Sequence, residues 1–234
     1  MELEPEIEPI TIVGAGRVGS ALAARLRERG LAVRISGREL DIAGATLVVL
    51  CVPDRAIAET AARIEPGPWI AHTSGATPLT VLSPHARRFS VHPLQTFTRT
   101  RGPEQLDGAW AAVTAEDDEA RRAGFWLAQT LGLEPFDLDD SERVLYHAGA
   151  VVASNYLVTL HRAAAELVAA AGAPAGALVP LMRRVVDNGF ELTGPIARGD
   201  WATVESHLEE IRARSPELEP LYRTLADATE AIAR

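Results

Sequence analysis

A glycine-rich segment constrains the fold of this chain more than any other feature. Residues 14–19 read GAGRVG, follow the apolar run 10–13 and precede apolar residues at helical spacing over 18–29. In a strand–turn–helix unit, the first glycine allows a tight turn, the second lets a phosphate approach the backbone, and the third lets the helix pack on the strand. Free amides at the start of such a helix bind phosphate. The residues predicted to form this dinucleotide-binding turn are Gly14, Gly16, Arg17, Val18 and Gly19.

Strand-like and helical patterns alternate up to residue 138. Apolar runs predict further strands at 32–36, 47–52, 69–72, 89–92, 110–114 and 135–138, and helical spacing predicts helices at 55–64 and 118–131. This alternation is typical of βαβ units around a parallel sheet. The stretch 37–45 is too short for a crossover helix, so we expect a loop or one turn there. Residues 1–138 are therefore predicted to form an α/β domain of the Rossmann type.

The pattern changes after Asp139. Asp139 and Glu142 have the spacing of a capping box, and no helix breaker occurs before Gly172 and Pro174. This predicts a helix of about 30 residues, roughly 45 Å long at 1.5 Å per residue. Further helical segments are predicted at 175–190, 200–214 and 216–233, with Asp200 as a helix cap. Residues 139–234 should form an all-helical domain. Its long helix is too apolar to face water all round, so it should lie in a helical core or in a subunit interface, and we expect a homodimer through this domain.

Composition excludes several classes of function. The net charge of −9 disfavours nucleic-acid binding, which needs basic surface. All 23 basic residues are arginine, so no lysine can form a Schiff base. The single cysteine, Cys51, permits neither an intrachain disulfide nor a cysteine-based zinc site, and we expect no metal. The acidic start is not a secretory signal and no run of ~18 apolar residues occurs, so we expect a cytoplasmic protein without a membrane span.

The end of the second predicted strand bears on the choice of dinucleotide. NAD sites usually carry Asp or Glu there to hold the ribose hydroxyls. This chain has Ser36 and Arg38 at that place, with no carboxylate before Glu39. A carboxylate would repel a 2′-phosphate, whereas a serine and an arginine would bind one. The sequence therefore predicts NADP as cofactor, the alternative for Arg38 being a solvated surface arginine.

Short loops follow the later strands at their carboxyl ends, where ligands of open α/β sheets bind. The residues expected to line the cofactor there are Val52, Pro53, Thr73 and Ser74. His72 and His92 also stand at strand ends, and histidine suits proton transfer near neutral pH. For each histidine the alternative is a structural role, with the ring bonded to a loop carbonyl.

The long predicted helix carries a second group of polar residues. In a regular α-helix His147 and Ser154 lie within about 20° of each other, and Asn155 lies about 80° from His147. His147 and Asn155 could therefore border one cleft, the alternative being a hydrogen-bonded network at an interface. Farther on, Arg198 could reach an anionic substrate or could be a surface residue of a helix–helix turn.

Several sequence blocks together resemble a bacterial family in which a Rossmann-like domain precedes a DUF2520 domain. The resemblance spans almost the whole chain. It rests on GAGRVG at 14–19, CVPD at 51–54, HTSG at 72–75, HPLQTF at 92–97, LYHAGAVVASNY at 145–156 and LTGPIARGD at 192–200. More distantly, the layout is similar to pyrroline-5-carboxylate reductase, ketopantoate reductase and the β-hydroxyacid dehydrogenases, with a helical domain of the 6-phosphogluconate dehydrogenase C-terminal type that often dimerises.

These likenesses imply an oxidoreductase but do not supply its mechanism. The catalytic lysine of β-hydroxyacid dehydrogenases corresponds to Val151, so their mechanism does not transfer. We expect an NADP-dependent oxidoreductase acting on a small carbonyl, imine or hydroxy acid. His147 would donate or accept the proton, Asn155 would orient the substrate carbonyl, and His92 is the second candidate. The alternatives are a non-catalytic dinucleotide-binding sensor or scaffold, and a structural dimer with a degenerate pocket.

Overall fold

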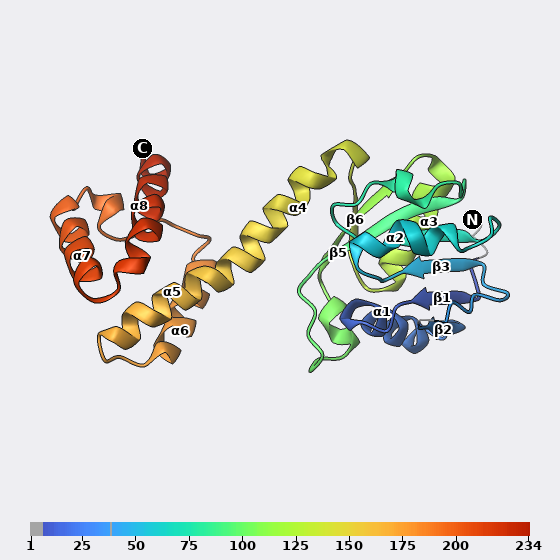
Figure 1. Ribbon diagram of the computed structural model, residues 1–234, viewed down its shortest axis with the longest axis horizontal. Coiled ribbons are helices and arrows are strands. Elements are labelled where there is room, and N and C mark those ends of the chain that lie inside the picture. Colours follow the sequence, from blue (N-terminus) through green and yellow to red (C-terminus); the bar gives the residue numbers. More distant parts are fainter. Residues whose placement is uncertain (1–6, 38) are drawn as a thin grey trace. The chain divides into compact units, whose positions relative to one another are not determined.

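The computed structural model describes residues 7–37 and 39–234. The chain divides into two compact units, Met1–Val151 and Val152–Arg234 (Figure 1). The first unit holds the sheet and the second is helical. Among the described residues, no helix combines the length and apolar character needed to cross a membrane.

A seven-stranded sheet forms the centre of the first unit. Its strands are β1 (Ile10–Val13), β2 (Val33–Ser36), β3 (Leu47–Leu50), β4 (Trp69–His72), β5 (Arg88–Leu94), β6 (Trp110–Ala115) and β7 (Glu134–Asp137), in the order β2-β1-β3-β4-β5-β6-β7. All neighbouring strands are parallel except β5 and β6, which are antiparallel. The alternation of patterns did not predict this exception, in which the chain between β5 and β6 stays at one end of the sheet instead of crossing it.

Helices cover both faces of this sheet. Helices α1 (Arg17–Glu28) and α3 (Asp118–Thr130) bury one face, and α2 (Asp54–Ala62) with the 3₁₀ turn η1 (Leu79–Leu82) buries part of the other. Alternate residues of β3 enter the two cores, which explains why this strand is apolar throughout. Between β2 and β3, residues 37 and 39–46 form turns and bends without a helix, as predicted.

The second face of the sheet becomes polar toward β5 and β6. Alternation along β5 places Phe89 and Val91 in the first core, which leaves Ser90 on the opposite face. Opposite Ser90 in the register are His72 of β4 and Thr114 of β6. The structures that follow β7, η3 (Asp140–Glu142) and α4 (Arg143–Val151), pack here rather than with the later helices. The division between the units therefore falls at residue 151, after the predicted start of the helical region at residue 139.

The predicted long helix is present, with an irregular turn in its middle. Helix α4 continues into a π-helical turn, η4 (Val152–Tyr156), and then into α5 (Leu157–Ala170). A π turn closes hydrogen bonds from i to i+5 and so changes the angular phase of all later residues. The α-helical angles calculated above between His147, Ser154 and Asn155 therefore do not hold.

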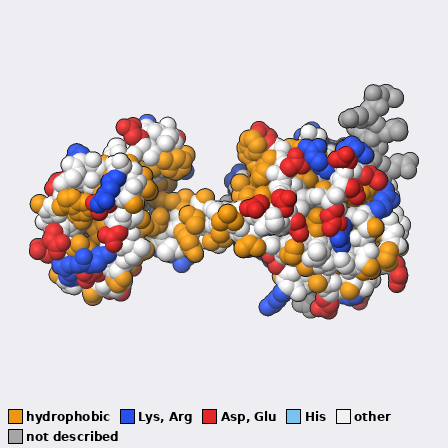
Figure 2. Space-filling model, turned by 90° about the horizontal axis from the view of Figure 1, so that it is seen from above, with side chains coloured by type: hydrophobic (Ala, Val, Ile, Leu, Met, Phe, Trp, Pro, Cys, Tyr) orange, Lys and Arg blue, Asp and Glu red, His pale blue; other side chains and the backbone are white. Residues whose placement is uncertain are grey.

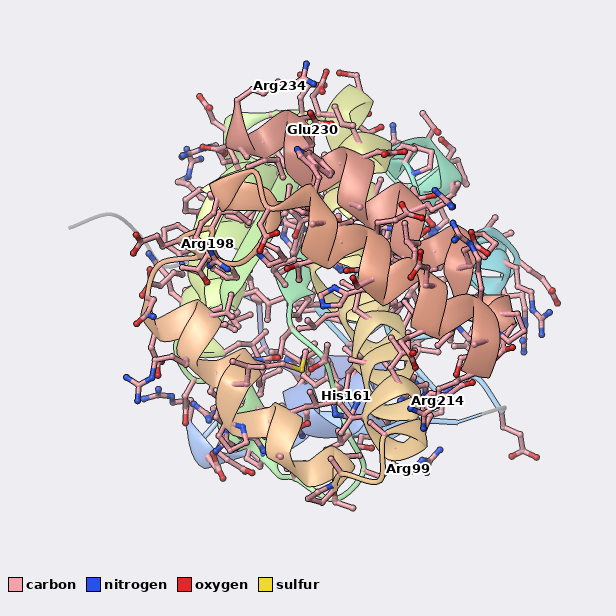
Figure 3. The ribbon with its side chains drawn as sticks, turned by 90° about the vertical axis from the view of Figure 1, so that its left-hand side faces the viewer. Arg99, His161, Arg198, Arg214, Glu230 and Arg234 are labelled. Atoms are coloured by element: carbon pink, nitrogen blue, oxygen red, sulfur yellow. The ribbon has the colours of Figure 1, made fainter. Side chains whose placement is uncertain are left out.

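The second unit continues with further helices and 3₁₀ turns after α5. They are η5 with α6 (Ala175–Ala177, Leu178–Asp187), η6 (Ile196–Arg198), α7 (Trp201–Arg214) and η7 with α8 (Pro216–Leu218, Glu219–Ala233). Asp200 caps α7 by accepting from the amide of Thr203, as predicted. Figure 3 marks His161 on α5 and Arg198, and shows Arg234 beside Glu230, which pair at 2.6 Å at the end of α8. A small core of Val204, Leu208, Ile211 and Ala226 holds α7 and α8.

Candidate active site

The glycine turn has the geometry that a bound phosphate requires. Gly14 has a φ of +110°, and a Cβ there would lie 2.5 Å from the carbonyl oxygen of Cys51. A Cβ on Gly19 would lie 2.0 Å from the carbonyl oxygen of Gly14, so α1 could not pack as it does. A Cβ on Gly16 would meet nothing within 4 Å. Two glycines are thus required by packing, whereas Gly16 keeps the backbone open to solvent at the start of α1.

The first turn of α1 is free to bind an anion. Gly16 is its N-cap, no side chain in the described part of the chain caps it, and no acidic residue stands in the first turn. The N-terminal amides therefore lack the acceptors that usually satisfy them, and the helix dipole favours negative charge there. Arg17 is exposed, while the side chain of Val18 packs against the core, so Val18 can offer a ligand only its backbone.

A cavity of about 440 Å³ lies beside this turn, between the ends of β1, β2 and β3. It is lined by Val13, Gly14, Ala15, Gly37, Leu40, Val52, Thr60 and Arg63. The predicted residue Val52 is among them. Arg63, just after α2, was not predicted, because nothing in its local sequence distinguishes it from other surface arginines.

Ser36 and Arg38 were predicted to hold a 2′-phosphate. Ser36 is buried, and its hydroxyl donates to the carbonyl of Glu39 and accepts from the amide of Asp41 at 2.9 Å. Its side chain is therefore used to shape the loop after β2. Arg38 lies outside the described residues.

The loops after β3 and β4 are joined by side-chain contacts. Ser74 donates to a carboxylate oxygen of Asp54 at 2.8 Å and accepts from the amide of Thr77 at 3.0 Å. Thr73 hydrogen-bonds the thiol of Cys51, whose pKa burial nevertheless raises to about 12, so the thiol stays protonated. Pro53 precedes the first residue of α2 as its N-cap. The predicted hydroxyls of Thr73 and Ser74 thus organise the edge of the sheet.

Two of the predicted catalytic histidines lie together, with a tyrosine that was not predicted. The ring centroids of His92 and His147 are 6.0 Å apart. Nδ1 of His92 lies 2.8 Å from the hydroxyl of Tyr146. Both imidazoles press on Gly75, where a Cβ would lie 2.6 Å from Cδ2 of His147 and 2.9 Å from Nε2 of His92. The absent side chain of Gly75 therefore lets the two rings approach the loop after β4.

The protonation states of this cluster follow from its burial. Burial lowers the pKa of His92 to about 4, and the nearby charges of His147 and Arg143 add to the effect. Burial likewise raises the pKa of Tyr146 to about 12. At neutral pH His92 is therefore neutral and Tyr146 is protonated, so the pair shares a hydrogen bond between two neutral groups.

Arg143 fixes this cluster to the sheet. It is fully buried and donates to the carbonyl oxygen of Ser74, to Ser90 at 3.0 Å and to Thr114 at 2.7 Å. Asp140 lies 3.8 Å from its Nε and accepts from the amide of Leu79. Because Arg143 stands one turn before Tyr146 and His147, its anchoring fixes both side chains over the end of β5.

His72 takes a structural role. It is fully buried, and its Nδ1 accepts from the amide of Ser74 at 3.2 Å. Burial, together with the charges of Arg143 and His92, lowers the pKa of His72 to about 3. This histidine therefore stays neutral and supports the loop that carries Ser74.

The remaining predicted residue, Asn155, lies on the π-helical turn of the second unit with Ser154. The i, i+3, i+4 spacing of Arg143, Tyr146 and His147 is the sequence signal that would have revealed the missed residues, because it puts them on one helix face. Among the described residues, no group of three or more His, Cys, Asp or Glu side chains is placed to hold a metal ion.

Solved structures with this fold come from several sources. A Bacteroides fragilis protein described as "putative NADP oxidoreductase BF3122" has 24% identity and a TM-score of 0.79, over 95% of this chain and 97% of that one. Protein TM1727 from Thermotoga maritima has 22% identity and a TM-score of 0.75, over 96% and 98%. A reductive aminase from Aspergillus terreus, in complex with NADPH and ethyl levulinate, has 18% identity and a TM-score of 0.66, over 95% and 92%.

At these identities the likeness shows the fold, a Rossmann domain followed by a helical region. A comparison with curated proteins found no match. The model of one family, described as a domain of unknown function (DUF2520), matches residues 109–229, which include β6, Arg143, Tyr146 and His147. The match covers more than half of the chain, which therefore belongs to the DUF2520 family.

Proposed function

We propose that this protein is an NADP-dependent oxidoreductase acting on a small carbonyl, imine or hydroxy acid. The observation that carries the proposal is the pairing of His92 with Tyr146 at the sheet edge that also bears the glycine turn. Both features belong to the same compact unit. The names of similar structures, an NADP oxidoreductase and a reductive aminase with NADPH, support the same reaction type.

In this proposal the dinucleotide supplies a hydride, and the protein handles the proton. If the hydroxyl of Tyr146 donates a hydrogen bond to Nδ1 of His92, the neutral imidazole carries its proton on Nε2. That N–H would then polarise a substrate oxygen or nitrogen, as a neutral histidine can. The substrate oxygen or nitrogen must also gain one proton, which His147, against the same glycine, would donate before it regains a proton from solvent.

The cavity of about 440 Å³ would receive the adenosine half of the cofactor. It lies at the end of β2, where the ribose of a bound dinucleotide is held in this fold. Its described lining contains one cation, Arg63, and no carboxylate. That charge balance favours NADP over NAD. Replacing Arg63 by Ala should therefore lower the affinity for NADPH more than the affinity for NADH.

The test begins with calorimetry of NADPH and NADH, followed by a screen of 2-oxo acids and cyclic imines for loss of NADPH absorbance. Consumption of NADPH that Tyr146→Phe slows would support the proposal. Tight binding with no consumption across the screen would instead make this protein a sensor or scaffold. If neither NADPH nor NADH binds at millimolar concentration, the remaining interpretation is a structural protein with a degenerate pocket.

A second proposal concerns assembly: the helical unit forms a homodimer. None of the described residues of α5 or α6 is buried, although both helices are rich in large apolar side chains. Figure 2 shows such side chains gathered on the surface of this unit. The exposed side chains on these two helices and beside them in the sequence include Val152, Tyr156, Leu157, Val158, Leu181, Val185, Val186 and Phe190. An apolar surface of this extent marks an interaction site, and a second copy is the commonest partner of such a face.

Light scattering would test the dimer. The double variant Leu181→Glu with Val186→Glu should become monomeric, because both residues are on α6 and more than half exposed. Ile232→Glu, at the exposed end of α8, is the matched control and should stay dimeric. A wild-type protein that is monomeric at micromolar concentration would contradict this proposal.

A further inference from the structure

A second cavity, of about 260 Å³, lies on the other side of the glycine turn. One wall is the start of α1, with Gly16, Arg17 and Ser20, and the other is the loop that follows β5, with Thr98, Arg99 and Arg101. Three arginines thus border one small cavity, and none of its described lining residues is acidic. This is a local exception in a chain whose net charge is −9.

The positive charge in this cavity is only partly compensated. Arg101 lies 3.7 Å from a carboxylate oxygen of the exposed Glu104. Within the described part of the chain, Arg17 and Arg99 have no ion-pair partner. Figure 3 shows the side chain of Arg99 projecting from the ribbon. Like charges gathered without a counter-ion favour the binding of an anion.

The loop that carries Arg99 and Arg101 is held in shape by a buried glutamine. Nε2 of Gln105 donates to the carbonyl oxygens of Arg101 at 2.8 Å and Gly102 at 2.9 Å, and its Oε1 accepts from the amide of Thr98 at 2.7 Å. Gln105 is only 2% exposed. Because these backbone groups are satisfied on the inner side, the arginine side chains are left on the outer side, beside the cavity.

The loop is also fastened to α1. The side chain of Arg25, on α1, is buried, and it donates to the carbonyl oxygen of Pro103 at 2.8 Å and to Asp107 at 2.7 Å. This contact fixes the distance between the arginine loop and the helix. The two cavity walls are therefore built before any ligand arrives, which lowers the ordering cost of binding.

We propose that Arg99 and Arg101 form a clamp that holds the diphosphate of the dinucleotide against the glycine turn. The proposal rests on the proposed function, because it assumes that a dinucleotide binds at this turn. The diphosphate is the anion that fits, since the same cavity contains the open amides at the start of α1 and the three arginines. Guanidinium groups bind phosphate oxygens through two parallel hydrogen bonds.

The test uses the full-length chain and the double variant Arg99→Ala with Arg101→Ala. Calorimetry would measure the affinities of NADPH, NADH and ADP-ribose, each up to millimolar concentration. The variant should bind all three more weakly than the wild type, by a similar factor of about tenfold or more, because they share the diphosphate. Raising the salt concentration should weaken NADPH less in the variant than in the wild type. Arg122→Ala, an exposed arginine on α3, is the control and should bind like the wild type.

Three results would overturn the clamp. Unchanged affinity for all three ligands would exclude any contact with the two arginines. A lower affinity for NADPH alone would assign the two arginines to the 2′-phosphate. A lower affinity for NADPH and NADH, with that for ADP-ribose unchanged, would assign them to the nicotinamide half. If the wild-type chain binds none of these ligands, the proposed function itself fails, a result distinct from a clamp that fails in a chain that binds dinucleotide. Unchanged thermal midpoints without ligand would show that the variant is folded.

Discussion

The hydroxyl of Tyr146 lies 2.8 Å from Nδ1 of His92 and joins helix α4 to strand β5. Each member of the pair lies on a different element, and Arg143 anchors the helix that brings them together. The bond fixes the orientation of the imidazole and leaves its Nε2 toward Gly75. Proton transfer or polarisation by His92 would therefore depend on Tyr146, although the tyrosine need not touch the substrate.

Replacing Tyr146 by Phe tests this dependence. Turnover of NADPH should fall by about 100-fold, the range typical for loss of an acid–base group, while the affinity for NADPH stays the same. Tyr222→Phe is a matched control, since Tyr222 also bonds a histidine ring, His207 at 2.7 Å, in the other unit. Equal turnover in the two variants would remove Tyr146 from the reaction.

The stability of the protein should depend on pH through the buried histidines. Burial lowers the pKa of His92 from 6.5 to about 4, so the unfolded chain binds a proton on this ring over a range where the folded chain does not. The free energy of unfolding should therefore decrease as the pH falls from about 6.5 to about 4, by up to roughly 3 kcal/mol for this residue. His72, lowered to about 3, acts in the same direction.

Urea denaturation between about pH 7 and pH 4.5 would measure this effect. The variant His92→Gln should show a shallower dependence on pH than the wild type, whatever its absolute stability. A dependence of equal slope in both proteins would show that His92 titrates normally in the folded state.

The contact between Gly75 and the two imidazoles gives a third prediction. In Gly75→Ala the new methyl group would meet His147 at 2.6 Å and His92 at 2.9 Å, so the rings must move. Turnover should fall by at least about tenfold with dinucleotide affinity retained, because small displacements of reacting groups are costly. Gly149→Ala, where a Cβ meets nothing within 4 Å, is the control on α4. Normal turnover in Gly75→Ala would mean that the present ring positions are not needed.

Local patterns were sufficient to predict most of the first unit and the start of α7 in the second. The residues 14–19, the apolar strand β3 and the cap Asp200 each carry their structural reason within a few neighbouring positions. Two other features could not be predicted from neighbouring positions in the sequence. The antiparallel pairing of β6 with β5 joins residues that are distant in sequence, and the residues around Asn155 have the pattern of a regular α-helix although the turn is π-helical.

The candidate site was predicted only in part. His92 and His147 could be singled out by residue type and by their position on predicted elements. Tyr146 is separated from His92 by 54 residues, so their contact follows from the packing of α4 on the polar part of the sheet, which periodicity does not reveal. The arginine loop after β5 was missed for the same reason, because its neighbour Arg17 is distant in sequence.

The burial of Arg143 leads to a prediction about stability. Arg143→Met would leave the carbonyl of Ser74 and the hydroxyl of Ser90 without this donor, in a site closed to water. The free energy of unfolding should fall by about 2–4 kcal/mol. Arg121→Met removes a bidentate pair with Asp137 that is exposed, and should cost much less than Arg143→Met. Equal losses in chemical denaturation would show that Arg143 does not anchor α4.

The three glycines of the first turn should respond differently to alanine. Gly16 has a φ of −75° and a ψ of −173°, which alanine adopts freely, and its Cβ would face open space. Gly16→Ala should therefore fold with a stability within about 1 kcal/mol of the wild type. The methyl group would nevertheless occupy the surface that a diphosphate must approach, so NADPH affinity should fall by about tenfold or more.

Gly19→Ala provides the contrast, because its Cβ would lie 2.0 Å from the carbonyl oxygen of Gly14 and should disturb folding as well as binding. Thermal denaturation with and without NADPH would separate the two effects, since a bound ligand raises the midpoint only where it still binds. If Gly16→Ala keeps the full shift with NADPH, no phosphate lies on that backbone. The dinucleotide would then have to bind elsewhere along the sheet edge, and the glycine turn would not be its binding site.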